Sequence, residues 1–343
     1  MTISLDDFLT LRGQLPVADV RSEGEYLEGH VPGVANIPIL NNEERVAVGT
    51  DYKKKGQKEA IKTGFRLVGP RLEQIITEAE KISGGKELLV HCWRGGMRSN
   101  NFCQFIGMSG IPSRQLIGGY KAYRQRAVES FGLPFQFMVV GGKTGSGKSE
   151  VLRALQQKGE QVLDLEKLAN HKGSVFGGLM MEPQPTTEQF QNNLFETILQ
   201  FNIKKRIWVE NESISIGRIF LPEALWKTLR GGALFRIDVV KEIRLQRLVN
   251  EYGHADKGEF LTAMEKIIKR LGGQHFLDAK EKLLAGDMAS TIDILLTYYD
   301  KAYSTGLEKR ESIIFPPVPW NGKDVHACAH DLIQLADALV VPQ

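Results

Sequence analysis

The chain has 343 residues, of which 42% are hydrophobic and 25% are charged, and its formal net charge is +3. This length favours two domains, because one domain usually holds about 100–200 residues. The composition is typical of a globular protein. The small net charge excludes a strongly basic field over the whole protein, but not a local basic patch. Three cysteines are too few for a disulfide framework.

Neither a secretory leader nor a membrane helix is expected. The first residues lack the basic and apolar blocks of a signal peptide. No apolar run reaches the roughly 18 residues that a membrane-spanning helix requires. We therefore expect a reduced, cytoplasmic protein with no membrane partner.

Residues 1–130 are predicted to form a small α/β domain. A buried strand in this domain delivers Cys92 at its carboxyl end, immediately before a glycine-rich stretch and a helix. The predicted elements are strands at residues 15–20 and 88–91, a helix at 99–108, and a strand with a glycine turn at 115–120.

A lysine run lies between these strands, at residues 53–58, with Lys62 and Arg66 beyond it. We interpret it first as a solvated face, which is the usual role of such a run. A contact with the phosphate backbone of a nucleic acid is the alternative.

Residues 131–134 are predicted to be a linker, and residues 135–343 a second α/β domain. Strands that alternate with helical patterns are typical of a parallel sheet flanked by helices. From about residue 242 the pattern is mostly helical. The predicted elements are strands at residues 137–140, 161–165, 207–209 and 234–240 and a helix at 149–158.

The stretch around Cys92 predicts a nucleophilic thiolate beneath a bound oxyanion. A helix start offers free N–H groups and a dipole that favours negative charge. Nearby arginines further lower the pKa of a thiol. Of the two arginines in this stretch, Arg94 is the one expected to point outward. Two glycines let successive N–H groups converge on an anion. The alternative is a small buried cysteine that only packs. The stretch is His91-Cys92-Trp93-Arg94-Gly95-Gly96-Met97-Arg98-Ser99.

The first 125 or so residues resemble a rhodanese domain, which moves sulfur or selenium on a loop cysteine. Rhodaneses usually place four residues between this cysteine and the following arginine, whereas five separate Cys92 from Arg98. The pattern His-Cys-x-x-Gly-x-x-Arg-Ser is also that of cysteine phosphatases. The resemblance therefore implies a loop widened for a phosphate-sized anion, such as selenophosphate. The other matching stretches are residues 19–26, 29–33, 35–38 and 118–120.

A second anion loop is predicted between a strand and a helix at residues 142–149. It satisfies G-x-x-x-x-G-K-[ST], whose glycines expose N–H groups to phosphate oxygens at a helix N-terminus. Lys148 supplies charge for the terminal phosphate, and Ser149 can hold Mg²⁺. The ligand class is a di- or triphosphate. The predicted phosphate-binding residues are Gly142, Lys143, Thr144, Gly145, Ser146, Gly147, Lys148 and Ser149.

Acidic residues follow two neighbouring predicted strands. Asp164 and Glu210 are candidate ligands for Mg²⁺ or substrate, and Glu166 and Glu212 each follow two residues later. Solvent-facing strand ends are the alternative. Arg244 and Arg247 lie three apart on one helix face. They could clamp phosphate, but we interpret them as surface arginines.

A rhodanese domain followed by a P-loop domain, with these two loops, resembles the tRNA 2-selenouridine synthase family over essentially the full chain. The resemblance implies an N-terminal rhodanese-like domain followed by a P-loop NTPase-like parallel-sheet domain with a helical C-terminal part. Further stretches that look like the family lie at residues 164–171, 173–177, 184–185, 210–213 and 299–303.

This family is understood to convert 2-thiouridine at wobble position 34 of the Lys, Glu and Gln tRNA isoacceptors into 2-selenouridine. The implied substrates are selenophosphate and geranyl diphosphate, the latter forming an S-geranyl intermediate. The implied partners are tRNA and a selenophosphate-producing enzyme. No tightly bound cofactor and no intrinsic metal are expected, apart from Mg²⁺ accompanying a substrate.

Our mechanistic hypothesis is a division of labour between the two loops. Cys92 would carry selenium or cleave the Se–P bond, with Arg98 as its catalytic partner. The phosphate loop would bind geranyl diphosphate. Selenophosphate would be held by Arg94, Gly95, Gly96, Met97, Arg98 and Ser99.

Two other functions fit the residues. A cysteine-dependent phosphatase fused to a P-loop small-molecule kinase is the main alternative. A non-catalytic tRNA-binding or GTPase module is the other, although no Asn-Lys-x-Asp stretch for guanine is present. Cys103 is expected in the core. Residue types that bind metals occur at His326, Cys328 and His330. On a helix, however, Cys328 would point away from the face that the two histidines share.

Overall fold

The structure is a computed structural model that describes residues 1–338, and it divides into two compact units. The first unit is Met1–Ser130 together with Gln191–Glu196, and the second holds the rest from Phe131 onward. None of the described helices is long and apolar enough to cross a membrane.

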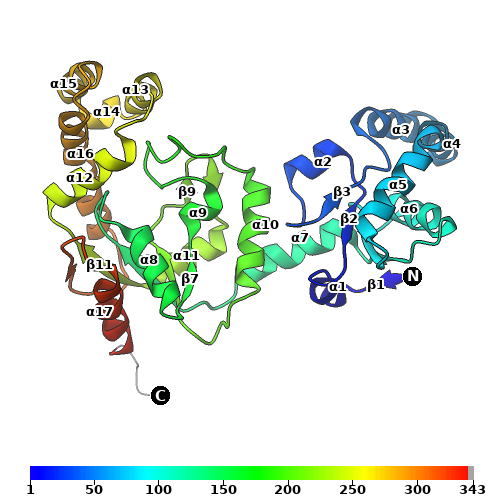
Figure 1. The fold of residues 1–343 in the computed structure, drawn as a ribbon, viewed down its shortest axis with the longest axis horizontal. Coiled ribbons are helices and arrows are strands. Elements are labelled where there is room, and N and C mark those ends of the chain that lie inside the picture. Colours follow the sequence, from blue (N-terminus) through cyan, green and yellow to red (C-terminus); the bar gives the residue numbers. More distant parts are fainter. Residues whose placement is uncertain (339–343) are drawn as a thin grey trace. The chain divides into compact units, whose positions relative to one another are not determined.

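The first unit is built on a five-stranded parallel sheet in the order β1-β5-β4-β2-β3. The central strand β4 is buried along its whole length, as expected for a parallel strand covered on both faces. Its elements are β1 (Thr2–Ile3), α1 (Leu5–Leu11), β2 (Val17–Asp19), α2 (Glu23–Glu28), β3 (Ala35–Asn36), α3 (Asn42–Lys55), α4 (Gln57–Val68), η1 (Gly69–Arg71), α5 (Leu72–Ser83), β4 (Leu88–His91), α6 (Met97–Met108), β5 (Ser113–Leu116) and α7 (Gly119–Ser130) (Figure 1).

The core of the first unit lies between this sheet and its helices. It joins residues of β2 and β4 to the apolar faces of α5 and α6, including Ile75, Ala79, Phe102 and Ile106. Cys92 belongs to this cluster, and Cys103 packs partly buried against it. The sheet therefore places Cys92 at the carboxyl edge of its central strand.

The second unit contains another five-stranded parallel sheet, in the order β12-β11-β6-β8-β7. The elements that follow Phe131 are β6 (Phe137–Gly141), α8 (Lys148–Gln157), β7 (Gln161–Leu163), α9 (Leu165–Ala169), α10 (Thr187–Ile198), β8 (Ile207–Glu210), β9 (Ser215–Ile216), β10 (Ile219–Phe220), α11 (Glu223–Gly231), β11 (Ala233–Asp238), α12 (Lys241–Tyr252), α13 (Lys257–Glu265), α14 (Ile268–Leu271), α15 (Gly273–Leu284), α16 (Met288–Glu308), β12 (Val318–Pro319) and α17 (Val325–Asp337). All belong to the second unit except the middle of α10, Gln191–Glu196.

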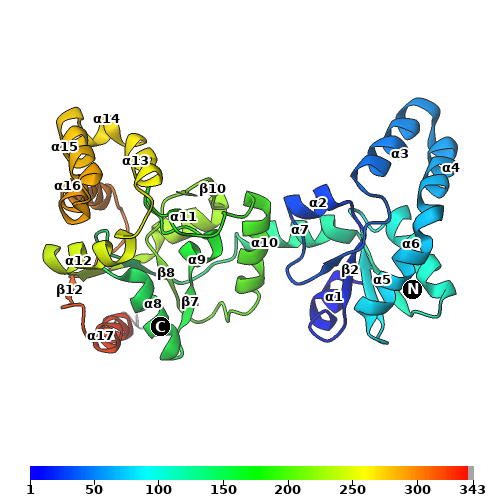
Figure 2. The same ribbon diagram turned by 45° about the horizontal axis from the view of Figure 1, so that its top comes forward.

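The second unit has two separate cores. One lies against the sheet and joins β6, β8 and β11 to α8 and α17. The other is mainly helical and joins α12, α13, α15 and α16 (Figure 2), with Phe176 from a turn between α9 and α10. The expected fold class, two parallel α/β domains with a helical C-terminal part, is confirmed.

Element boundaries differ from the sequence-based expectations by a few residues. The strand expected at 161–165 ends at Leu163, because Asp164 caps α9 by accepting a hydrogen bond from Lys167 N at 2.8 Å. The lysine run, for which no helix was predicted, lies within the helical pair α3 and α4.

Candidate functional site

The cysteine loop connects β4 to α6 and is held against the first turn of α7. The amides of Tyr120 and Lys121 donate to the carbonyls of Cys92 and Trp93, both at 2.9 Å. Gly95 has a φ of +63°, and a Cβ there would lie 2.4 Å from the carbonyl oxygen of Leu116. Only glycine fits this close approach, so the loop geometry is fixed by backbone contacts.

The thiol of Cys92 is buried, and its sulfur lies 3.1 Å from Ser99 Oγ. Burial alone would raise the pKa of this thiol. Hydrogen bonds from the Ser99 side chain and from the backbone of Ser99 and Gly96, with the charge of Arg98, outweigh burial and lower the pKa. The loop thus favours a thiolate.

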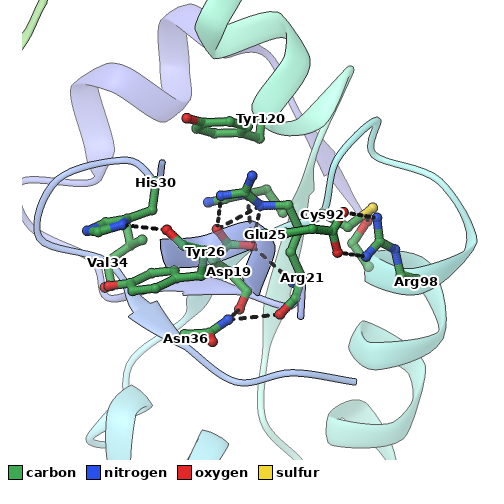
Figure 3. Close-up of polar contacts among 12 residues, drawn as sticks. Asp19, Arg21, Glu25, Tyr26, His30, Val34, Asn36, Cys92, Arg98 and Tyr120 are labelled. Atoms are coloured by element: carbon green, nitrogen blue, oxygen red, sulfur yellow. Dashed lines mark hydrogen bonds and ion pairs between the residues drawn. The ribbon is translucent and has the colours of Figure 1, made fainter. Parts of the chain in front are cut away.

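Arg98 is paired with Glu25, a residue of α2. Arg98 Nη1 and Nη2 donate to the Glu25 carboxylate at 2.6 and 3.1 Å (Figure 3). Burial tends to raise the pKa of Glu25, but the hydrogen bonds and charge of Arg98 lower it to about 2. Arg45 of α3 adds a second cation, 3.1 Å from the same carboxylate. This pairing could not be read from the sequence.

A fully buried ion pair lies beside the loop at the end of β2. Arg21 donates to Asp19 at 2.6–3.0 Å and stacks over the Tyr120 ring, 3.8 Å from its centroid (Figure 3). His91, also buried, has a lowered pKa because burial disfavours its charged form. These contacts join the two rhodanese-like signature stretches, at residues 19–26 and 118–120.

The other predicted selenophosphate-binding residues lie as a curled segment around Cys92. Ser99 is buried, whereas the Arg94 side chain is exposed and that of Met97 is 47% exposed. Arg94 and Met97 can therefore offer backbone N–H groups more readily than side chains, which agrees with the outward direction expected for Arg94.

The phosphate loop of the second unit follows β6 and ends in the first turn of α8. Gly145 has a φ of +81°, and a Cβ there would lie 2.9 Å from the carbonyl oxygen of Arg244. The Ser146 hydroxyl is buried and has no hydrogen-bond partner among the described residues.

A cavity of about 1180 Å³ opens over this loop. Lys143 is not among its lining residues, and its Nζ lies 3.9 Å from Asp300 Oδ2. The predicted phosphate-binding residues that line the cavity are Gly142, Thr144, Gly145, Gly147, Lys148 and Ser149.

Acidic side chains gather beside Ser149. Its hydroxyl donates to Glu166 at 2.9 Å. Burial and then the charge of Glu166 raise the pKa of Glu212 to about 8. Glu210 is fully buried, accepts from Leu165 N at 2.9 Å, and has its pKa raised by burial and by Asp164 and Glu166. Glu166 rather than Asp164 or Glu210 therefore contacts the loop serine.

The two arginines of α12 have different surroundings. Arg244 is 2% exposed, donates to both Asp300 oxygens at 2.8 and 2.7 Å, and reaches the Thr144 carbonyl at 3.1 Å. Its interpretation as a surface arginine is wrong, because α16 covers it with an acidic partner. Arg247 lines the cavity and lies over the Trp320 ring at 4.6 Å.

A small, mostly apolar cavity adjoins the large one. Thr144, Ser174, Leu248, Tyr252 and Tyr299 line both. Its remaining lining residues come from the helical core and are Phe176, Phe260, Ile292, Leu295 and Leu296. This small cavity has a volume of only about 20 Å³, roughly the space of one water molecule, so its apolar lining and not its size distinguishes it.

The residues of the suggested histidine and cysteine cluster lie on α17. Cys328 is buried in the sheet core, and burial raises its pKa to about 12. His326 and His330 lie outside that core. Cys328 therefore packs as an apolar side chain.

Family comparisons cover both units. Residues 4–126 match the rhodanese-like domain, and residues 135–329 match the tRNA 2-selenouridine synthase AAA domain. Curated tRNA 2-selenouridine synthases from Nitrosomonas europaea, Shewanella denitrificans and Shewanella sediminis are 30%, 34% and 36% identical to the chain. The matches cover 90%, 92% and 88% of this chain and 93%, 93% and 90% of those proteins. The chain therefore belongs to the tRNA 2-selenouridine synthase family.

Proposed function

We propose that this protein is a cytoplasmic tRNA-modifying transferase that replaces sulfur by selenium in 2-thiouridine at wobble position 34. The expected substrates are the Lys, Glu and Gln isoacceptors, selenophosphate and geranyl diphosphate. The names of its relatives support tRNA as the substrate and 2-selenouridine as the product. The observation that carries the chemistry is the Cys92 loop, which combines an acidified thiol with a phosphatase-like arginine.

Geranyl diphosphate is the ligand proposed for the second unit. The N–H groups at the start of α8, with Lys148, suit its diphosphate. The small cavity behind Thr144 is lined by apolar side chains, and these would have to move apart to contact an isoprenoid chain, whereas the polar edges of a nucleobase require hydrogen-bond partners. This lining favours a prenyl donor over a nucleotide.

In the first proposed step, the sulfur of 2-thiouridine attacks C1 of the geranyl group. The new C–S bond forms as the C–O bond breaks, diphosphate leaves with the bonding electrons, and the N3 proton of the base is lost to solvent. Lys148 and the loop N–H groups stabilise the departing diphosphate charge. The product is an S-geranyl group, which is a better leaving group than the original sulfur.

In the second proposed step, the Cys92 thiolate attacks the phosphorus of selenophosphate held by Arg98 and the loop N–H groups. An S–P bond forms, the Se–P bond breaks, and the electron pair remains on selenium. The released selenide adds to C2 of the base and expels geranyl thiolate, and water hydrolyses the phosphocysteine to phosphate. Selenium keeps its oxidation state throughout, so no oxidant is needed, whereas a perselenide on Cys92 would require one.

The residues beside Ser149 fit a Mg²⁺ ion that accompanies the diphosphate. Mg²⁺ prefers oxygen ligands, and the Ser149 hydroxyl with the carboxylates of Glu166 and Glu212 provides them at the cavity wall. Such an ion would neutralise charge on the diphosphate. Asp164 also lines this cavity and, like Glu210, stays a predicted ligand.

Mass spectrometry of tRNA nucleosides tests the proposal, after incubation with selenophosphate and with or without geranyl diphosphate. We expect S-geranyl-2-thiouridine to require geranyl diphosphate, and 2-selenouridine to require both. Cys92→Ser should lose selenation and keep geranylation, with Cys103→Ser as the matched control. Lys148→Ala should lose geranylation and still selenate tRNA that is already geranylated, with Lys158→Ala as control.

Two results would contradict the proposal. Loss of both reactions in Cys92→Ser would refute the division of labour between the loops. No gain of selenium or geranyl by the unaltered protein, together with phosphate release from an aryl phosphate, would establish the phosphatase and kinase alternative.

A further inference from the structure

We propose that the helical hairpin of α3 and α4 is an RNA-binding surface that holds the phosphate backbone of the tRNA. This inference rests on tRNA being the substrate, as proposed above. The hairpin is inserted between β3 and β4, and Figure 2 shows the two helices as a pair that projects from the first unit. Residues 51–66 contain six lysines and arginines and two acidic residues. The hairpin is thus more positive than the chain as a whole.

α3 contributes almost nothing to the core of the first unit. Its 14 residues include one buried side chain, Glu44, which is paired with Arg71 of the neighbouring η1. The helix packs mainly on α4 and is otherwise exposed. A helix that is polar on all sides is not maintained by burial of an apolar face. Its exposed surface is therefore available for a partner.

Several cations of the hairpin are not neutralised by neighbouring acids. Lys55 pairs with Asp51, and Lys62 pairs with Glu59. Lys53, Lys54 and Lys58 are exposed and form no ion pair with any described residue. Exposed, unpaired lysines at this density are suited to contact phosphates, which bind such side chains with release of counterions.

The cations of α4 lie opposite its buried residues. Ala60, Thr63 and Val68 are buried; Val68 belongs to the core, and Thr63 donates to Asp51 of α3. Lys58, Lys62 and Arg66 recur every four residues and therefore share the opposite, exposed side of the helix. This row has the geometry of a cationic stripe.

Exposed aromatic rings accompany these cations. Tyr52 of α3 is 58% exposed and Phe65 of α4 is 56% exposed. More than half of each ring is exposed among lysines, so it can stack on an unpaired base, as aromatic side chains do in proteins that bind single-stranded RNA. An acidic protein partner would use the charges and leave the rings without a role. RNA is therefore the favoured partner.

The hairpin is connected to the cysteine loop through one carboxylate. Arg45 lies on the same face of α3 as Tyr52, seven residues away. Its Nε is 3.1 Å from Glu25, and Glu25 accepts both hydrogen bonds of Arg98. A nucleic acid that follows the hairpin cations toward Arg45 would thus arrive at the mouth of the loop that holds Cys92.

Binding of a fluorescently labelled transcript of the lysine tRNA to the full chain tests this surface, measured over a range of salt concentrations. The test variant is Lys53→Ala/Lys58→Ala. The control is Lys81→Ala/Lys86→Ala, which removes the same charge from exposed sites of the first unit outside the hairpin. We expect the hairpin variant to bind about tenfold more weakly. Its slope of log affinity against log salt should shrink by about 1.4–1.8, since each lost phosphate contact removes about 0.7–0.9.

A third variant, Tyr52→Leu, separates stacking from charge. It should bind more weakly with an unchanged salt slope, because a ring and not an ion is removed. Equal affinity and slope in the hairpin and control variants would overturn the inference while leaving the proposed function intact. The hairpin variant could instead bind tRNA normally but show lower selenation when a second enzyme generates the selenophosphate. That result would mean that the hairpin binds the selenophosphate-producing enzyme and not tRNA. Failure of the unaltered chain to bind tRNA would refute the proposed function itself.

Discussion

The carboxylate of Glu25 accepts hydrogen bonds from both terminal nitrogens of Arg98, at 2.6 and 3.1 Å, and so occupies the fork that an incoming oxyanion requires. The pair has two consequences. It holds the guanidinium in one orientation beside Cys92, and it places a negative charge where the proposed selenophosphate would bind. In this proposal Glu25 is a positioning residue whose charge competes with the ligand.

The first prediction concerns this competition. Glu25→Gln should bind thiophosphate, a stable analogue of selenophosphate, several-fold more tightly than the unaltered protein, because the amide keeps a hydrogen bond to Arg98 without the opposing charge. Isothermal titration calorimetry measures the affinity, with Glu28→Gln on the same helix as the control. Weaker binding in Glu25→Gln would mean that orientation of Arg98 matters more than its neutralisation.

The second prediction concerns the thiolate. Ser99→Ala removes a hydrogen bond to the Cys92 sulfur, so the pKa of the thiol should rise. Alkylation by iodoacetamide at neutral pH should slow by about tenfold, since a hydrogen bond to a charged group is worth roughly 1.5–3 kcal/mol. The pH dependence of the alkylation rate should move to higher pH. Ser109→Ala, after the end of the same helix, should leave the profile in place. An unchanged profile in Ser99→Ala would assign the lowered pKa to the backbone and Arg98 alone.

The two strand–loop–helix segments that carry the proposed anion loops could be predicted because each is local in sequence. Residues 92–99 and 142–149 hold their own glycines and charges within one strand–loop–helix unit, so short-range patterns suffice. The parallel sheets were predictable for the same reason, since strands such as β4 are continuous apolar runs.

Partners that come from distant segments were not predictable. Glu25 meets Arg98 across 73 residues, and Arg244 meets the Thr144 carbonyl across 100 residues. Such contacts depend on how helices pack, which no periodic pattern encodes. α3 escaped prediction because it lacks the apolar stripe that a helical period requires.

The third prediction concerns the apolar cavity. Leu295→Ala removes part of the cavity wall and so enlarges the cavity. The ratio of farnesyl to geranyl transfer onto tRNA should therefore rise above that of the unaltered protein. A truncation of this kind costs about 2–5 kcal/mol in stability, but a ratio of two donors is insensitive to the folded fraction. Competition between the two diphosphates, analysed by mass spectrometry, gives the ratio. Leu284→Ala, at an exposed site, serves as the control. An unchanged ratio in Leu295→Ala would mean that the isoprenoid chain of the donor does not bind in this cavity.

The fourth prediction concerns Glu212, whose pKa of about 8 lies above the ordinary value of 4.5 because burial and then Glu166 disfavour its charged form. Between these two values the folded protein holds a proton that the unfolded chain has released. The stability that this proton supports is fully present below about pH 4.5 and is lost as the pH rises through 8. Glu212→Gln cannot titrate. Its melting temperature should therefore fall less between pH 5 and pH 8.5 than that of the unaltered protein, whereas Glu265→Gln should behave like the unaltered protein. An equal fall in all three proteins would show that Glu212 ionises freely in the folded state.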